Sequence, residues 1–287
     1  MVDFGFGYAC EWLLEHAKGG RMKSVRQTAL IQKADIVIMG SSRAHHHYVP
    51  SILSDSLGVS VYNAGVDGNG IVLATGLYEL MKERYEPTII IYDVTPAFDI
   101  NVYVEDGNNT RYIGWLRPYC DNDKVMRIIN RVDPLERYKN ISLMFRYNSR
   151  FVDLLKDQVV VAGFRTDGYV EMKGEMKKEP IINRNERPAI LDTLKLNMME
   201  EMVARLSSTQ NTDLVVMASP KYGATNSDVF APVKKICNNY GVAFWDYYCS
   251  SEFQRMEYFK EPMHLNEKGA LAFTECLASR IKSSFLY

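Results

Sequence analysis

The sequence predicts a three-layer α/β/α fold built on a five-stranded parallel sheet. Short apolar runs alternate with segments of helical spacing along most of the chain, which is typical of strands joined by helical crossovers. The apolar runs are continuous rather than alternating, as expected for strands covered on both faces. Crossovers between parallel strands are right-handed and need about a dozen residues, and the helical segments are long enough to supply them.

The expected elements follow one another in a clear order. Two helical stretches come first, at residues 6–17 and 24–33, with Ser24 as a cap of the second. The five strands are expected at residues 35–39, 59–62, 88–92, 213–217 and 242–245. Further helices are expected at residues 71–84, 191–206, 227–239 and 267–283, with Ser227 and Asn266 as caps of the last two. Because the third and fourth strands are too far apart for one crossover, residues 99–188 are expected to form an insertion or cap within a single domain of residues 1–287.

Composition excludes several classes of function. The chain has 287 residues, 47% of them hydrophobic, and a formal net charge of -1. A large core is therefore possible, and no basic surface for nucleic acid is expected. The five cysteines are scattered without a CxxC pair, so we expect neither a metal site nor a disulfide framework, and no cofactor. No apolar stretch approaches the ~18 residues of a membrane-spanning helix.

The first chemically suggestive segment is Gly40-Ser41-Ser42-Arg43, directly after the first strand. Glycine permits a sharp turn, and a serine at the start of a helix lies among free N–H groups that favour negative charge. This geometry suits a nucleophile whose attack creates an oxyanion. The alternative is a serine that only caps the helix.

Two further segments complete a possible site. Residues 63–70 contain three glycines after the second strand, which permits close approach of the backbone to a ligand, although a turn without a chemical role is the alternative. Glu261 precedes His264 by three residues, just before the last helix. In a loop this spacing lets the carboxylate accept one imidazole N–H and leaves the other nitrogen free as a base. The alternative is a surface histidine beside a helix cap.

Together these segments resemble the SGNH/GDSL hydrolase superfamily, and more narrowly its bacterial members with a Gly-Ser-Ser-Arg nucleophile segment. The resemblance implies a flavodoxin-like sheet with Ser42 as the catalytic serine, in the third position of Gly40-Ser41-Ser42 where the family has Gly-Asp-Ser. It implies His264 as the base and Glu261 as its carboxylate, in place of the family's Asp. The N–H groups of Ser42 and Gly68 would form the oxyanion hole.

The third family block departs from the pattern. An Asn is expected after the third strand, but the chain reads Tyr92-Asp93-Val94-Thr95-Pro96. The third oxyanion donor is then missing, or it comes from Asn69 or Thr95. Loss of one such donor costs roughly a hundredfold or more in rate.

Other conspicuous residues surround this pattern. His45, His46 and His47 cannot all face one ion, because consecutive helical positions point in different directions, so one of them is expected to contact the substrate cleft instead. Arg43 is a candidate for binding an anionic part of the substrate, with a surface ion pair as the alternative. Aromatic residues in the insertion would form either a sugar-stacking wall or a packed core, and they are Tyr103, Tyr112, Trp115, Tyr119 and Tyr147.

The sequence therefore predicts a serine esterase or acyl transferase acting on O-acyl groups. The resemblance implies O-acetyl groups of a glycan as the substrate. One alternative is a degenerate SGNH domain that binds a glycan or an assembly partner without turnover, and another is a flavodoxin-like domain that binds a nucleotide or flavin, which the few glycines of residues 40–45 disfavour. We expect export or membrane tethering through a segment ahead of Val2, with a cytoplasmic enzyme as the competing hypothesis. The acyl group, the acceptor and the oligomeric state are not predicted.

Overall fold

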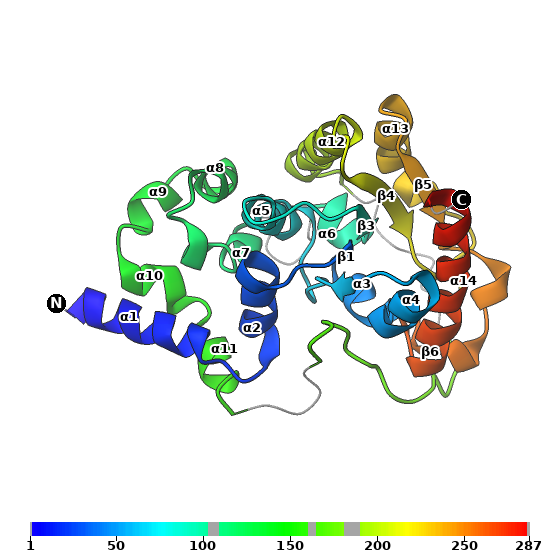
Figure 1. Cartoon of the computed structure of the whole chain (residues 1–287), viewed down its shortest axis with the longest axis horizontal. Helices are drawn as coiled ribbons and strands as arrows, with labels where there is room; N and C mark the ends of the chain where they lie inside the picture. Colours follow the sequence, from blue (N-terminus) through cyan, green and yellow to red (C-terminus); the bar gives the residue numbers. More distant parts are fainter. Residues whose placement is uncertain (1, 103–108, 160–164, 181–189, 286–287) are drawn as a thin grey trace.

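The computed structural model describes residues 2–102, 109–159, 165–180 and 190–285. Its central sheet has the strand order β2-β1-β3-β4-β5, with all neighbouring strands parallel (Figure 1). The strands are β1 (Ile36–Gly40), β2 (Val61–Asn63), β3 (Ile89–Asp93), β4 (Asp213–Ala218) and β5 (Ala243–Asp246). The predicted fold class is therefore confirmed, and each expected strand lies within two residues of an observed one.

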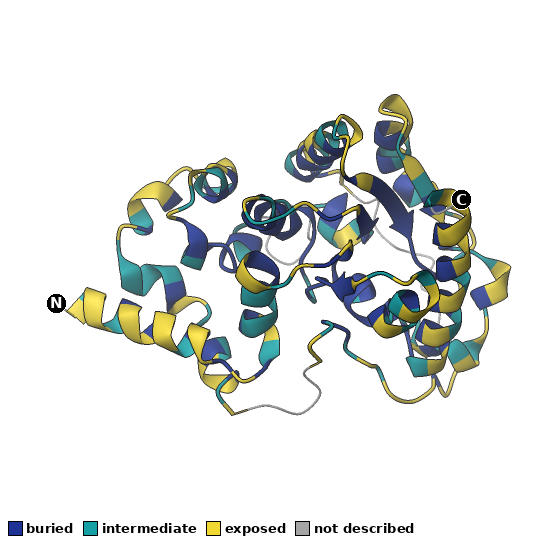
Figure 2. Ribbon diagram, viewed as in Figure 1, coloured by how far each residue is buried: buried dark blue, intermediate teal, exposed yellow. Residues whose placement is uncertain are grey.

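Helices cover both faces of this sheet, so that each strand divides its side chains between two cores. Val37 and Met39 face a core that includes α5 (Ile71–Lys82), α12 (Thr193–Ser207) and α13 (Ala231–Asn239). Ile36 and Ile38 face the opposite core, formed with α4 (Pro50–Leu57) and α14 (Glu267–Phe285). The sheet is consequently buried on both sides, as Figure 2 shows, which explains why its strands are apolar at successive positions.

A second group of helices lies at one end of the sheet (Figure 1). It combines two N-terminal helices with helices from the predicted insertion. The N-terminal elements are α1 (Val2–Glu15) and α2 (Gly20–Arg26), which continues as the π-helix η1 (Gln27–Ile31). Those of the insertion are α7 (Thr110–Ile113), η2 (Arg117–Tyr119), α8 (Asp123–Val132), α9 (Glu136–Lys139), α10 (Leu143–Asn148) and α11 (Phe151–Lys156). The short helix α6 (Pro96–Asp99) follows β3 and packs against α5 and α12 instead. The carboxylate of Asp3 on α1 accepts hydrogen bonds from the N–H groups of Leu143 and Met144 at the start of α10.

This helical group shares its core with one face of the sheet. Cys10 and Leu14 of α1 and Val125 and Ile129 of α8 belong to the same buried cluster as Val37 of β1. That continuity supports a single domain of residues 1–287 with residues 99–188 as an insertion, which stays a prediction.

Two of the three expected helix caps differ from the prediction. Ser24 lies inside α2, where its hydroxyl donates to the carbonyl of Gly20 at 3.1 Å, because the helix begins earlier, at a glycine with φ of 84°. Ser227 precedes the short helix η3 (Asp228–Phe230), which delays the start of α13. Asn266 does cap α14, since its side-chain oxygen accepts from the N–H groups of Lys268 and Gly269.

The aromatic residues of the insertion that the sequence analysis singled out are buried wherever they are described. Tyr112, Trp115, Tyr119 and Tyr147 are all at most 9% exposed, so they pack a core and do not form an open sugar-stacking wall. Tyr103 lies outside the described residues.

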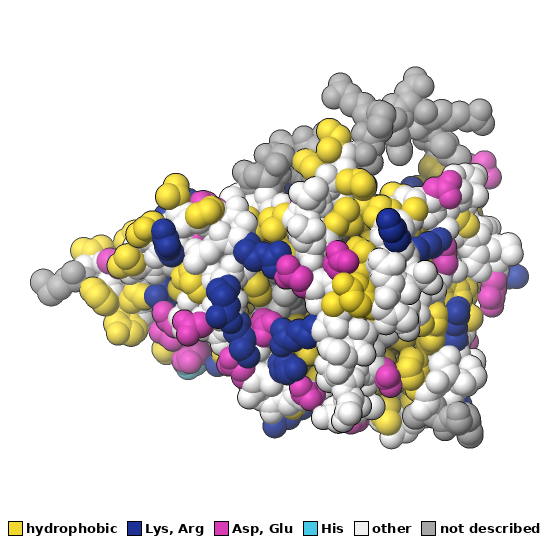
Figure 3. Space-filling view, turned by 90° about the horizontal axis from the view of Figure 1, so that it is seen from above, with side chains coloured by type: hydrophobic (Ala, Val, Ile, Leu, Met, Phe, Trp, Pro, Cys, Tyr) yellow, Lys and Arg dark blue, Asp and Glu magenta, His cyan; other side chains and the backbone are white. Residues whose placement is uncertain are grey.

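Several exposed apolar residues lie on α1. Val2, Phe4, Tyr8 and Trp12 are exposed on α1, at the narrow end of the molecule in Figure 3. Among the described residues, no helix combines the length and the apolar character needed to cross a membrane.

Candidate active site

Ser42 lies just beyond the carboxyl end of β1, at the first position of α3 (Ser42–His47). Gly40 makes the turn between the two elements possible, because its φ is 141° and a Cβ atom there would lie 2.5 Å from the carbonyl oxygen of Asp93. Ser41 is fully buried and donates a hydrogen bond from its hydroxyl to that of Thr95 at 2.9 Å. Ser42 thus lies beyond the carboxyl ends of the strands, next to the point where the strand order switches.

Glu261 and His264 lie on a small antiparallel hairpin rather than in a loop. The hairpin consists of β6 (Phe259–Glu261) and β7 (His264–Leu265), and its register pairs Glu261 directly with His264. This pairing brings Glu261 Oε1 into a hydrogen bond with His264 Nδ1, while Oε2 accepts from the N–H of Met263 at 3.0 Å. Burial raises the pKa of Glu261, but the hydrogen bonds from His264 and Met263 outweigh it and leave the pKa below its ordinary value.

The hairpin places His264 against the serine. Ser42 Oγ lies 2.7 Å from His264 Nε2, so the contact expected from the sequence is present. With Glu261 ionised, His264 donates from Nδ1 and its Nε2 lone pair accepts the Ser42 hydroxyl proton. Serine, imidazole and carboxylate therefore form one hydrogen-bonded chain of the kind that activates a nucleophile.

The loop that carries Gly68 packs against α3. Asn63 donates from Nδ2 to the carbonyls of Ala44 and Tyr48 at 2.7 and 3.2 Å. A Cβ atom on Gly65 would lie 2.4 Å from the backbone nitrogen of His45, so the loop needs glycine for this approach. Gly68 has φ of 68°, in the left-handed region. An oxyanion role for the N–H groups of Ser42 and Gly68 stays a prediction.

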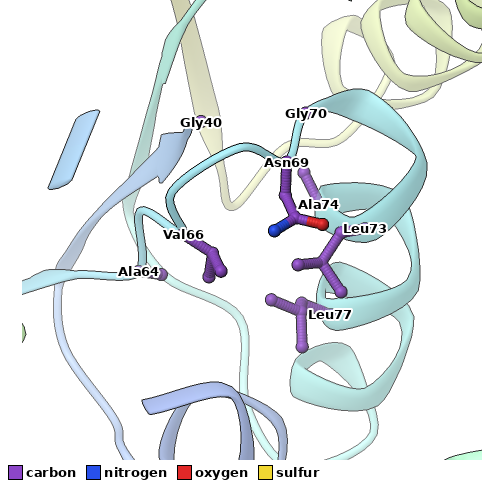
Figure 4. Close-up of a pocket in the computed structure, with 8 residues that line it drawn as sticks. All are labelled: Gly40, Ala64, Val66, Asn69, Gly70, Leu73, Ala74 and Leu77. Atoms are coloured by element: carbon purple, nitrogen blue, oxygen red, sulfur yellow. The ribbon is translucent and has the colours of Figure 1, made fainter. Parts of the chain in front are cut away.

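The side chains of Asn69 and Thr95 are engaged within the fold. Asn69 Nδ2 donates to the carbonyl of Asp67 at 2.9 Å, and Figure 4 shows the Asn69 side chain pointing into an apolar recess between its loop and α5. The backbone N–H of Thr95 donates to Asp99 at 2.6 Å, and its hydroxyl accepts from Ser41. A third oxyanion donor from Asn69 or Thr95 stays a prediction.

Arg43 is neither a surface ion pair nor an accessible ligand for substrate, which corrects both expectations. Its side chain and that of Asp93 are 0% exposed, and Nη2 lies 3.3 Å from Asp93 Oδ1. Arg43 also donates to Ser219, from Nη2 to the carbonyl at 2.5 Å and from Nε to Oγ at 3.1 Å. Tyr48 donates its hydroxyl hydrogen to Asp93 Oδ2 at 2.7 Å. Arg43, the residue after Ser42, therefore anchors α3 through buried contacts to Asp93 and Ser219.

His47 extends this buried network to the hairpin. Its Nδ1 donates to Ser219 Oγ at 2.9 Å, and its Nε2 accepts from the N–H of Leu265, the neighbour of His264, at 3.0 Å. Burial and the nearby charge of Arg43 hold the pKa of His47 well below its ordinary value, in agreement with a neutral ring that accepts at Nε2. His47 thereby joins the segment of Ser42 to the segment of His264.

The other two histidines of α3 contact Asp67 in the glycine-rich loop. His45 Nδ1 and His46 Nε2 lie 2.7 and 3.1 Å from Asp67 Oδ1. The ring of His46 also meets the ring of His264 edge-on, with centroids 5.6 Å apart. Of the three consecutive histidines, His46 and His47 thus border His264, while His45 and His46 share one carboxylate.

A recess of about 250 Å³ lies near the hairpin. It is lined by Glu179, Pro180, Tyr222, Gly223 and Gln254. The N–H of Tyr222 donates to the carbonyl of Pro262, between Glu261 and His264, at 2.9 Å. The recess therefore borders the hairpin that carries Glu261 and His264.

Sequence reasoning missed Asp67, Asp93 and Ser219. Asp93 is the last residue of β3, and Ser219 follows the last residue of β4. Polar residues at the carboxyl ends of adjacent parallel strands meet at one edge of a sheet, and this signal was available. Asp67 also carried a signal, as the one charged residue in a loop of small and apolar residues.

Comparison with known proteins adds little beyond these features. No protein-family model and no curated protein sequence matches this chain. Several solved structures resemble it weakly, including two at 10% sequence identity. A gut microbial diltiazem-metabolizing enzyme aligns over 85% of this chain and 46% of its own, with a TM-score of 0.42. An acetyl xylan esterase from the rumen bacterium Butyrivibrio proteoclasticus aligns over 86% and 63%, with a TM-score of 0.41. The chain thus spans less than two thirds of either protein, and similarity at this level carries no functional argument.

Proposed function

We propose that this protein is a serine ester hydrolase or acyl transferase that acts on O-acyl groups. The observation that carries the proposal is the chain of hydrogen bonds from Ser42 through His264 to Glu261, with 2.7 Å between Ser42 Oγ and His264 Nε2. A serine is a weak nucleophile unless an adjacent base removes its proton, and a carboxylate on the far side of the imidazole stabilises the cation that results.

The reaction follows from this geometry in two steps. His264 takes the hydroxyl proton as Ser42 Oγ attacks the acyl carbonyl, and the N–H groups of Ser42 and Gly68 hold the oxyanion. The carbonyl re-forms as the alcohol leaves with the proton from His264, which leaves an acyl-serine. Water, or an acceptor hydroxyl, gives its proton to His264 and attacks the acyl-serine. The bond to Ser42 Oγ then breaks, His264 returns the proton to that oxygen, and an acid or a new ester is released.

The finer assignment rests on the sequence resemblance. We propose a short acyl group, acetyl above all, carried by a glycan hydroxyl. Export or membrane tethering belongs to the same proposal, since acylated glycans of this kind lie outside the cytoplasm.

Hydrolysis of p-nitrophenyl acetate by the wild-type protein and by Ser42→Ala tests the proposal. We expect hydrolysis by the wild type, labelling of Ser42 by a fluorophosphonate probe, and loss of both in the variant. Ser54→Ala is a matched control, because Ser54 lies on α4 among partly exposed residues away from the hairpin. Equal rates in wild type and Ser42→Ala would show that the activity does not come from this site.

A second function has one observation in its favour. The third-block Asn of the SGNH/GDSL pattern is absent from this sequence, and the side chains of Asn69 and Thr95 make hydrogen bonds within the fold. A protein with this defect would bind an acylated glycan without turning it over. An absence of both hydrolysis and fluorophosphonate labelling in the wild type would favour this binding function.

A further inference from the structure

His45, His46 and Asp67 form a cluster that the proposed esterase chemistry does not use. The two histidines come from α3, and Asp67 comes from the loop after β2. One ligand atom from each lies within 4.8 Å of the others. The histidine side chains are 9% and 8% exposed, while that of Asp67 is 25% exposed. The cluster is thus enclosed on the protein side and open to solvent at the carboxylate.

The hydrogen bonds around His46 show which of its nitrogens is available. Nδ1 lies 2.7 Å from the carbonyl oxygen of Val170, and only a protonated nitrogen makes such a contact. In the neutral ring, Nε2 then carries a lone pair that faces Asp67 Oδ1 at 3.1 Å. Two acceptors in this arrangement repel each other unless a proton or a metal ion lies between them.

The same arrangement is common around metal-binding histidines. A ligating histidine almost always donates its other N–H to a carbonyl or carboxylate, which fixes the ring for the metal. The carbonyl of Val170 does this for His46. His45 directs Nδ1 at the same oxygen of Asp67 from 2.7 Å, so two imidazole nitrogens and one carboxylate oxygen converge.

We propose that His45, His46 and Asp67 bind a divalent transition-metal ion, with Zn²⁺ as the best match to this set of ligands. Three protein ligands of the nitrogen and oxygen type, with a fourth position open to water, are typical of zinc bound in an accessible site. The sequence argued against a metal because three consecutive histidines cannot converge. The structure resolves that objection, since His47 turns away to Ser219 and Asp67 takes its place.

The distances agree with such an ion. Zinc binds imidazole nitrogen and carboxylate oxygen at about 2.0–2.2 Å, which separates tetrahedral ligand atoms by about 3.4 Å. The two contacts to Asp67 measure 2.7 and 3.1 Å, and all three ligand atoms lie within 4.8 Å of one another. Small adjustments of the Asp67 carboxylate and of the two imidazole rings would give the required spacing. Arg21 lies 3.4 Å from Asp67 Oδ2, the carboxylate oxygen that does not bind the ion in this proposal.

Metal binding would also fix the loop of the oxyanion hole. Asp67 directly precedes Gly68, and both histidines lie on the helix that begins at Ser42. An ion shared by these residues would hold Gly68 at a constant distance from Ser42. The binding itself does not depend on the proposed esterase function.

Zinc titration of the chelator-stripped wild-type protein, in competition with a chromogenic chelator, tests the proposal. We expect one equivalent of Zn²⁺ with a Kd below about 1 µM, and visible absorption bands of tetrahedral Co²⁺ when cobalt replaces zinc. Asp67→Ala and His45→Ala should each weaken binding by about 100-fold or more. Asp67→Asn keeps the shape of the side chain without its charge, and it should also weaken binding.

Two control variants separate this site from other histidines. His16 is exposed and stacks on Trp12, so His16→Ala should bind zinc as the wild type does. His264→Ala removes the catalytic base and should also retain the ion. The proposal is overturned if the wild type takes up no zinc at about 100 µM free metal. That result would indicate that His46 is protonated and forms an ion pair with Asp67. It is equally overturned if binding survives in Asp67→Ala or disappears in His264→Ala.

Discussion

Replacing Arg43 with Met tests the buried network that supports the nucleophile. Arg43 donates to Asp93 Oδ1, to the carbonyl of Ser219 and to Ser219 Oγ, with all of these groups buried. Removal of one partner from a buried ion pair costs about 3–5 kcal/mol, because the other charge stays uncompensated. Asp93 would keep only the hydrogen bonds from Tyr48 and from the N–H of Ser219, at 2.7 and 3.2 Å.

We therefore expect Arg43→Met to lower the free energy of unfolding by about 4 kcal/mol. Arg43→Lys retains the charge, but one ammonium group cannot serve three acceptors in the fork geometry, so a loss of about 2 kcal/mol is expected. Arg131→Met is the matched control. Arg131 also binds a carboxylate through two nitrogens, but Glu201 is 62% exposed, and such pairs contribute about 1 kcal/mol or less.

Urea unfolding followed by circular dichroism measures these differences. A double variant, Arg43→Met with Asp93→Asn, should recover part of the loss, because no buried charge then stays unpaired. Hydrolysis of p-nitrophenyl acetate should fall in Arg43→Met even where the variant is folded, since Ser219 also holds His47 and through it the segment of His264. A cost below about 1 kcal/mol for Arg43→Met, or strict additivity in the double variant, would refute this account of the network.

Two further predictions concern individual carboxylates. Glu261→Gln keeps a hydrogen-bond acceptor for His264 but loses the charge that stabilises the imidazolium. The kcat for p-nitrophenyl acetate should therefore fall about 100-fold or more while the fold is unchanged. An unchanged kcat would show that Glu261 does not assist His264. Burial raises the pKa of Asp99 to about 6, against hydrogen bonds from Tyr92, Thr95 and Ile71 that lower it. Because the folded state then holds the proton more tightly than the unfolded chain, the stability of the wild type relative to Asp99→Asn should be greatest near pH 4 and fall by up to ~3 kcal/mol as the pH rises through 6. Urea unfolding of both proteins between pH 4 and 7 measures this difference, and an increase with pH would contradict the burial argument.

The α/β architecture could be read from the sequence because it depends on local patterns. Continuous apolar runs such as residues 88–92 mark strands buried on both faces, and the structure has β3 at Ile89–Asp93. The contact between Ser42 and His264 was also predictable, because Ser42 follows such a run and His264 precedes the last helix. Their roles as nucleophile and base stay a prediction. Helix starts were less predictable, because many serines in a chain can cap a helix. Ser24 is an example: the helix starts at Gly20 instead, and that start depends on packing against Asp157.

The buried polar contacts were decided by the tertiary structure alone. Arg43 carries no sign in the sequence that its partners will be Asp93 and Ser219, which lie 50 and 176 residues further along the chain. Likewise, His45 and His46 meet Asp67 only because β2 pairs beside β1 and the loop after β2 folds back onto α3. Hydrophobic spacing along a chain specifies which face of an element is buried. It does not specify which polar groups from distant segments will face one another there, since that depends on the order and register of the strands.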